Sequence, residues 1–365
     1  MTDIDQRVRE LHEQAIIIDG HSDILIPVNE GKMQLGERVE VPAPEDWQPP
    51  IGFTGPPNSF GFGAHTLHFG PMGQYDLPRF REAGLTAQVC AIYLDDDRLK
   101  YPVQYGLELT WQLHNAVETN EDFELITTAQ YIPRLKAEGK LGAILSFEGC
   151  EALGGDIRFL DLYHQLGLRI ASLTHSRRNI FADGSGAASH EGGLTPLGKQ
   201  LIQKMNDLRI LVDLVHIGEA GFWEILELTT APVILSHTTP TMFANSDPTV
   251  ISPLAGAAQP RLELPRDQER LEAIAKNGGV VGLIWILHEN IDSVVQDIET
   301  ALEVVGPDHI GMGSDLYGLE LAPRGLEDIS KVPALTRKLV ERGHSDEVIL
   351  KFLGGNFLRL FEQVW

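Results

Sequence analysis

Residues 195–216 read TPLGKQLIQKMNDLRILVDLVH and contain the repeating unit of the fold in one stretch. Thr195 is a typical helix N-cap residue and Pro196 suits the first helical position, so a helix is predicted to begin there. A run over 210–215 follows that is apolar except for Asp213, and such a near-continuous run is typical of a strand buried on both faces. The run is followed by His216, so a side chain that can bind a metal or move a proton stands where a buried strand stops.

The same alternation of helix and apolar strand runs through the chain. Eight short apolar runs are predicted as strands, over 15–19, 85–94, 141–147, 168–174, 210–215, 232–236, 279–285 and 309–314. Amphipathic stretches are predicted as helices over 102–120, 157–167, 195–208, 218–230, 266–277 and 291–305, and near 332–342 and 345–362. This order predicts the α/β class, as a parallel (β/α)8 TIM-type barrel. A doubly wound open sheet is the alternative, but the sequence lacks its usual Gly-rich phosphate loop.

Two segments rich in Gly and Pro, near 29–75 and 239–262, interrupt this alternation. Regular elements resume on each side, so we predict long loop insertions in a single barrel domain that spans 1–365. The N-terminus has no apolar signal region, and no apolar run approaches the roughly 20 residues of a membrane span. Cys90 and Cys150 are the two cysteines of the sequence, which excludes a disulfide scaffold. We therefore expect a cytoplasmic protein.

The charge of the chain limits its partners. It has 29 Lys+Arg against 52 Asp+Glu, a formal net charge of -23 at pH 7. Such a surface repels nucleic-acid phosphates and anionic lipid, so we expect neither nucleic acid nor membrane as a partner. A small-molecule substrate is the remaining class. The oligomeric state stays open, with a homodimer as one assembly.

Polar residues gather where the predicted strands end, which is where barrel enzymes carry their chemistry. Ionisable side chains at these ends are His21, Asp23, Glu148, His175, His216, His237 and Asp315. Any one of them can be explained as a loop cap. Together they are costly beside an apolar core unless they coordinate something. His nitrogens and carboxylate oxygens suit a divalent transition metal, so we expect a metal centre there.

These residues, in this order, resemble the membrane (renal) dipeptidase family, peptidase family M19, of the amidohydrolase superfamily. The stretches that carry the resemblance are 18–26, 76–88, 146–149, 173–184, 193–216, 231–238, 310–318, 325–335 and 354–362. Together they run over nearly the whole chain. The resemblance implies a distorted (β/α)8 barrel that holds two Zn2+ ions. It also implies cleavage of dipeptides, often with tolerance for a D-residue at the C-terminal position.

Five residues match the metal ligands of the family. By this resemblance His21 and Asp23 are ligands of one zinc, and His216 and His237 are ligands of the other. Glu148 matches the bridging carboxylate, which the resemblance also counts among the catalytic residues.

Other matches concern the substrate. By resemblance, His175 contacts the substrate and its tetrahedral intermediate, and Asp315 is the catalytic aspartate. The family holds the substrate carboxylate with an Arg after the sixth strand; Arg261 is the better match here and Arg266 the alternative.

The function predicted from these residues is zinc-dependent hydrolysis of dipeptides, L-Xaa-L-Xaa and also L-Xaa-D-Xaa, by a hydroxide that bridges the two metals. Arg177 and Arg178 follow His175, and Arg178 is taken as a further substrate contact. A guanidinium there would favour an acidic C-terminal residue, unless both arginines pair with acidic loops. Two alternatives are an amidohydrolase acting on N-acyl amino acids or another small amide or ester, and a non-catalytic binding protein with a broken ligand set.

Overall fold

The structure is a computed structural model, and it describes residues 3–39, 73–187, 192–240, 265–286, 288, 290–318 and 322–365. The two predicted insertions, near 29–75 and 239–262, lie largely outside the described residues. No helix in these ranges is long and apolar enough to cross a membrane. Cys90 and Cys150 are buried and free, in agreement with the absence of a disulfide scaffold.

Eight parallel strands close into a barrel. The strands are β1 Ile18–Asp19, β2 Ala87–Tyr93, β4 Leu141–Glu148, β5 Leu168–Ser172, β6 Leu211–Asp213, β7 Ile234–Thr238, β8 Val280–Leu283 and β9 Ile310–Met312. Each pairs with its neighbour, and the pairings of β1 with β9 and of β2 with β4 complete the ring. A short extra strand, β3 Phe123–Leu125, lies beside the start of β4. The predicted TIM-type barrel is confirmed, and the open doubly wound sheet is excluded.

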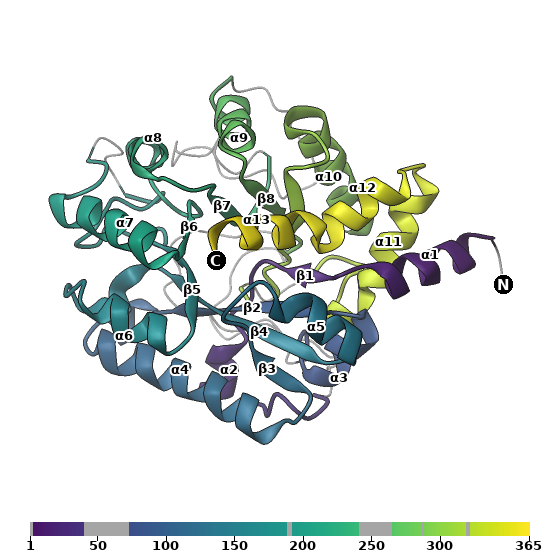
Figure 1. Ribbon diagram of the computed structural model, residues 1–365, viewed down its shortest axis with the longest axis horizontal. Helices are drawn as coiled ribbons and strands as arrows, with labels where there is room; N and C mark the ends of the chain where they lie inside the picture. Colours follow the sequence, from purple (N-terminus) through teal and green to yellow (C-terminus); the bar gives the residue numbers. More distant parts are fainter. Residues whose placement is uncertain are drawn as a thin grey trace, which may run out of the picture.

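Helices surround the barrel (Figure 1). They are α1 Asp3–Gln14, α2 Leu25–Asn29, α3 Leu77–Ala83, α4 Pro102–Thr119, α5 Tyr131–Glu138, α6 Phe159–Gln165, α7 Pro196–Leu208, α8 Glu219–Leu228, α9 Pro265–Asn277, α10 Ile291–Val305, α11 Val332–Glu341, α12 Asp346–Leu350 and α13 Asn356–Val364. The cap predicted for α7 is present, because the Thr195 hydroxyl accepts a hydrogen bond from the Gly198 N–H at 3.0 Å.

The prediction of one helix over 345–362 is wrong in one respect. A π-helical turn, Lys351–Gly355, separates α12 from α13. Gly354 lies within this turn, and a Cβ atom there would stand 2.4 Å from the backbone oxygen of Ile16. The glycine therefore lets the C-terminal helix pass directly under the chain that enters β1.

The amino-terminal end of the barrel is apolar. Early residues of the strands form one buried cluster with α13, made of Ile18, Ala87, Val89, Ile144, Ile170, Leu211, Ile234, Val280, Phe357, Leu360, Phe361 and Val364, among others. In Figure 1, α13 crosses in front of the strands and closes this end. The side chains of the strands and of α13 in this cluster are removed from water on folding, and their burial supplies a large share of the hydrophobic free energy of folding.

Candidate metal and catalytic centre

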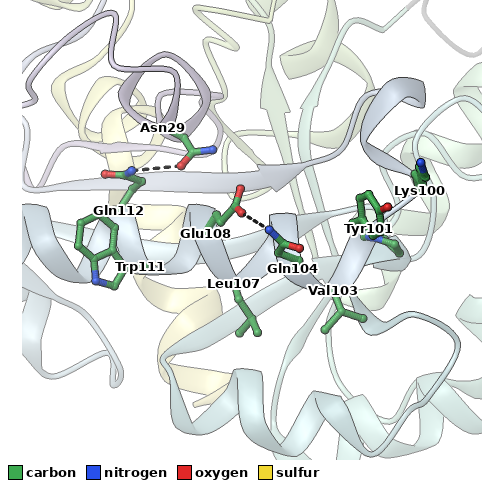
Figure 2. A pocket seen from close by; sticks show the side chains of 10 residues that line it. Asn29, Lys100, Tyr101, Val103, Gln104, Leu107, Glu108, Trp111 and Gln112 are labelled. Carbon is green, nitrogen blue, oxygen red and sulfur yellow. Dashed lines mark hydrogen bonds between the residues drawn. The ribbon is translucent and has the colours of Figure 1, made fainter.

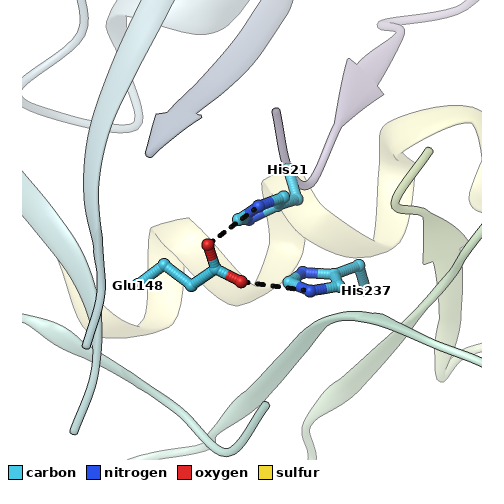
Figure 3. Close-up of side chains that lie close together, drawn as sticks. All are labelled: His21, Glu148 and His237. Carbon is cyan, nitrogen blue, oxygen red and sulfur yellow. Dashed lines mark ion pairs between the residues drawn. The ribbon is translucent and has the colours of Figure 1, made fainter. Parts of the chain in front are cut away.

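The opposite, carboxyl-terminal end of the barrel is polar, and Glu148 is its hub. The Nε2 atoms of His216 and His237 lie 3.0 and 3.5 Å from its Oε1. The Nε2 atom of His21 lies 3.7 Å from its Oε2. Figure 3 shows the carboxylate between His21 and His237, with one oxygen toward each ring. One carboxylate therefore faces histidines on both sides, as a group shared by two neighbouring ions would.

Further predicted residues complete the centre. The His21 Nε2 atom lies 3.7 Å from Asp23 Oδ2 and 3.6 Å from Asp315 Oδ1. On the other side, His175 Nε2 lies 3.8 Å from Glu148 Oε1. The fold thus brings together residues from the first strand and the last, as the strand-end pattern predicted.

Backbone features aim these side chains. β4 runs to Glu148 itself, while the pairing of β7 with β8 shifts register between Leu235 and Thr238. At this shift the Ser236 carbonyl turns inward, so close that a Cβ on Gly282 or Gly313 would stand 2.0 Å from it. Only glycine fits these two positions without displacing backbone. The two glycines therefore make room for the irregular end of β7, which carries His237.

Two residues of the centre have left-handed backbones. His216 has φ 59° and Asp315 has φ 57°. Residues other than glycine seldom adopt this conformation, and its strain concentrates at functional sites. The strained backbone is one reason to regard both residues as parts of a site.

Hydroxyl groups hold two of the imidazoles. Ser236 Oγ lies 3.0 Å from Nδ1 of His237, and Ser176 Oγ lies 2.9 Å from Nδ1 of His175. With Nδ1 engaged, the Nε2 atom of each ring is left for the centre. Such outer contacts commonly orient metal-binding histidines.

Two buried carboxylates next to the centre accept hydrogen bonds from the backbone around it. Asp19 is buried and accepts hydrogen bonds from the Tyr75 hydroxyl at 2.7 Å and the Ser314 N–H at 2.8 Å. Asp213 accepts from the N–H groups of Val215 at 3.0 Å and Ser236 at 3.1 Å. These bonds tie the ends of neighbouring strands together beside the site residues.

The histidines and carboxylates of the centre shift one another's pKa values. Burial lowers the pKa of His21, but Glu148, Asp23 and Asp315 outweigh burial and raise it to about 10. Burial and the nearby His216 lower the pKa of His175 to about 3. Burial raises the pKa of Asp315 well above its usual range, although His21 opposes this. The carboxylates therefore compete for positive charge in a buried space.

The donor set fits divalent metal ions. His21 Nε2 and Asp23 Oδ1 are buried and have no hydrogen-bond partner in the described part of the chain. The Nε2 atoms of His216 and His237 are 3.1 Å apart, so two imidazoles aim at the same space. Three groups have ligand atoms close enough to hold an ion: His21, Glu148 and His237; Glu148, His175 and His216; His21, Asp23 and Asp315. Buried orphan donors of these types are what a bound cation would satisfy.

Tyr93 belongs to the site, although the sequence analysis did not single it out. It is the last residue of β2 and pairs in register with Glu148. Its ring centroid lies 4.7 Å from that of His175. The sequence signal that could have identified Tyr93 is a tyrosine near the end of a predicted strand, shortly before the three aspartates at 95–97.

The two arginines that follow His175 form ion pairs with acidic side chains. Arg177 donates to Asp96 at 3.0 Å and to Glu151 at 3.2 Å. Arg178 donates to both carboxylate oxygens of Asp183. This is the alternative in which the arginines pair with acidic loops. Arg261 and the side chain of Arg266 lie outside the described residues.

A groove of about 940 Å3 lies away from this centre, on the outer face of α4 (Figure 2). Its walls include Tyr101 and Trp111, each 60% exposed, and Leu107, 45% exposed. The groove lacks the convergent ionisable groups of the strand ends. We therefore place the chemistry at the strand ends.

A closed parallel barrel with a buried histidine and carboxylate centre at its strand ends defines a metal-dependent hydrolase of the TIM-barrel type. The sequence model of the family described as "Membrane dipeptidase (Peptidase family M19)" matches residues 5–365. The chain therefore belongs to the membrane dipeptidase family, peptidase family M19, and is a metallo-dipeptidase.

Two curated relatives are dipeptidases by name. Dipeptidase aclJ of Aspergillus oryzae is 30% identical over 315 residues, 80% of this chain and 70% of that protein. Dipeptidase tcpJ of Claviceps purpurea is 29% identical over 255 residues, 67% of this chain and 56% of that protein.

Solved structures share the fold. A metallopeptidase from Rhodobacter sphaeroides, liganded with a phosphinate mimic of the dipeptide L-Ala-D-Ala, has a TM-score of 0.76 at 22% identity and covers 96% of this chain and 100% of its own. The probable dipeptidase PvdM from Pseudomonas aeruginosa has a TM-score of 0.76 at 20% identity, with 99% and 98% covered. At these identities the likeness concerns the fold.

Proposed function

We propose that the protein is a zinc-dependent dipeptidase with two metal ions per chain. The observation that carries this proposal is Glu148, whose two oxygens face histidines that come from opposite sides of the barrel. His21 and Asp23 would hold one ion, and His216 and His237 the other. Glu148 would belong to both. Two ions bound there would supply a hydroxide nucleophile near neutral pH and would polarise the scissile carbonyl.

The chain's own groups complete the reaction. Asp315 Oδ1 lies 3.6 Å from His21 Nε2, in position to accept a proton at the centre and to transfer it to the departing amine. His175 is neutral because its pKa is lowered to about 3, so its ring can donate one hydrogen bond to the oxyanion that develops on the substrate. No covalent intermediate is required, and the buried Cys150 plays no part.

The substrate we propose is a dipeptide, L-Xaa-L-Xaa or L-Xaa-D-Xaa. The relatives named dipeptidases support a dipeptide substrate, and the L-Ala-D-Ala mimic bound by the Rhodobacter protein supports L-Xaa-D-Xaa. Arg261 is the group we propose for the substrate carboxylate. The ion pairs of Arg177 and Arg178 weaken the expectation that acidic C-terminal residues are preferred.

Metal content and turnover on the same preparation test this proposal. We expect close to two divalent ions per chain, loss of L-Ala-L-Ala and L-Ala-D-Ala hydrolysis after chelation, and recovery with zinc. Glu148→Gln should lower metal occupancy as well as turnover, because a neutral amide is a poor ligand between two cations.

N-acetyl-L-alanine serves as the comparison substrate. Full activity in a metal-free sample would refute the metal centre. Hydrolysis of the N-acyl compound without hydrolysis of the dipeptides would favour the amidohydrolase alternative.

A further inference from the structure

Asp315 lies in a turn with an unusual backbone, just after the end of β9. Asp315 and Tyr317 both have left-handed conformations, with φ values of 57° and 71°. Residues other than glycine keep this conformation only where their surroundings hold them in it. The groups that hold this turn therefore also decide where the Asp315 carboxylate lies.

Ser314, the residue before Asp315, is buried and is held from two sides. Its N–H donates to Asp19 Oδ1 at 2.8 Å, and its hydroxyl donates to Asp19 Oδ2 at 2.5 Å. Its carbonyl accepts a hydrogen bond from the Trp285 N–H at 3.1 Å. The backbone that enters the turn is thus fixed between the end of β1 and the chain that leaves β8.

A hydroxyl from another part of the sequence completes this arrangement. Tyr75 is fully buried, and its hydroxyl donates to Asp19 Oδ2 at 2.7 Å. The same hydroxyl contacts the Ser314 hydroxyl and lies 3.3 Å from the backbone oxygen of His21. One phenol therefore joins the first strand, which leads to His21, with the last strand, which leads to Asp315.

Gln74, the neighbour of Tyr75, holds the other side of the turn. Its buried side-chain oxygen accepts a hydrogen bond from the Tyr317 N–H at 2.6 Å. The Tyr317 hydroxyl accepts another from the Gly73 N–H at 2.9 Å. These contacts follow Asp315 along the chain, whereas the contacts of Tyr75 precede it.

The segment 73–75 is itself anchored. The Gln74 carbonyl accepts a hydrogen bond from the Ile329 N–H at 3.0 Å. Directly after the segment, Asp76 caps α3 by accepting from the Arg79 N–H at 2.8 Å. Because the segment is tied to a helix and to the chain beyond the turn, its side chains can hold an unfavourable backbone in place.

We propose that Gln74 and Tyr75 are positioning residues for Asp315. They hold the turn in which Asp315 Oδ1 lies 3.6 Å from His21 Nε2, and they affect the reaction through Asp315 alone. This inference rests on the proposed dipeptidase function, in which Asp315 transfers the proton.

The first test is Tyr75→Phe, which removes the hydroxyl and keeps the ring. Loss of a group that orients a site residue lowers activity by about 10–100-fold, and we expect kcat for L-Ala-L-Ala to fall within this range. KM and the content of bound metal should stay unchanged. Gln74→Met removes the acceptor for the Tyr317 N–H and should act in the same direction, so it serves if Tyr75→Phe does not fold.

The second test repeats Tyr75→Phe in the Asp315→Asn background. If Tyr75 acts through Asp315, the added change should lower the remaining kcat by less than about twofold. An equal fold loss in both backgrounds, a loss of bound metal, or a kcat of Tyr75→Phe equal to that of the wild type would overturn the inference.

Tyr163→Phe is the matched control. Tyr163 is buried too, but its hydroxyl has no hydrogen-bond partner among the residues that the structure describes. Removal of this hydroxyl should leave kcat unchanged.

Crystal structures of the zinc-loaded wild type and Tyr75→Phe add a measurement that does not depend on activity. We expect the Asp315 carboxylate to be displaced in the variant while Glu148 and His237 keep their places. An unmoved Asp315 would overturn the inference even if kcat fell. A wild type that hydrolyses no dipeptide would remove the proposed function, and the position of Asp315 would still test the role of Tyr75.

Discussion

The two ends of the barrel are built from the same strands, yet their side chains have opposite chemistry. At the amino-terminal end, Ile144 of β4 and Ile234 of β7 lie in the apolar cluster closed by α13. A few residues further along the same strands, Glu148 and His237 face the polar centre. The change from core to site takes only a few positions of one strand. The comparison shows how this barrel separates the groups that stabilise it from the groups that we assign to chemistry.

The largest effect is expected from Asp315→Asn at the polar end. The loss of a group that transfers protons should lower kcat by about 10²–10⁴-fold. Asn tolerates the left-handed backbone found at this position, with φ 57°, so the thermal midpoint should not fall. Steady-state kinetics, metal analysis and a thermal melt of one sample check this. Near-normal kcat would remove Asp315 from its assigned role.

The matching change at the apolar end is Phe357→Ala, which should lower stability and leave kcat unchanged. Phe357 is fully buried and stacks on Phe361 with ring centroids 6.0 Å apart. Truncation of such a ring costs about 3–5 kcal/mol of unfolding free energy. Urea unfolding should show this loss, while the kcat of the protein that remains folded stays unchanged. Leu358→Ala, on the less buried side of the same helix, should lose less.

A fall in kcat for Phe357→Ala that matches the fall for Asp315→Asn would contradict the separation of the two ends. Such a fall would mean that packing at the amino-terminal end of the barrel also positions the site residues at the carboxyl-terminal end.

A smaller effect is expected from His12 of α1, far from the centre. His12 Nε2 lies 2.8 Å from the Thr336 hydroxyl, and burial together with Lys136 lowers the pKa of His12 from 6.5 to about 4. Because the unfolded chain binds the proton more readily, the stability contributed by neutral His12 is lost as pH falls from about 6.5 toward 4. Between pH 7 and pH 5 this amounts to about 2 kcal/mol.

The measurement is the unfolding free energy of the wild type and of His12→Gln at both pH values. Gln can keep the hydrogen bond to Thr336 but does not titrate. The wild type should therefore lose about 2 kcal/mol more than the variant on acidification. Equal losses in the two proteins would show that His12 is not the titrating group.

The sequence predicted the barrel because each buried strand is a run of apolar residues, a signal that does not depend on the rest of the chain. It missed α5, Tyr131–Glu138, where Pro133 argues against a helix. Pro133 lies in the first turn, where no N–H group is needed, so the helix forms regardless. It also overextended the first strand, since residues of 15–19 before Ile18 lie outside β1.

The candidate ligands were predictable from strand ends, because their residue types are rare beside an apolar core. The residues that support these candidate ligands could not be predicted from strand ends. Asp213 matters through its bond to the N–H of Ser236 on the neighbouring strand, a contact that depends on register. Tyr93 was missed because it ends an apolar run and was counted with it.

The way in which β1 is held also sets an order of events during synthesis. β1 pairs with β2 on one side and with β9 on the other, and Gly354 lies against the chain on which β1 begins. Most of these partners are translated hundreds of residues after β1 itself. The ring thus stays open on the ribosome, with unpaired strand edges and an uncovered apolar end of the kind that invites aggregation. His21 meets Asp315 only when the last strand arrives, so a nascent chain carries no complete centre.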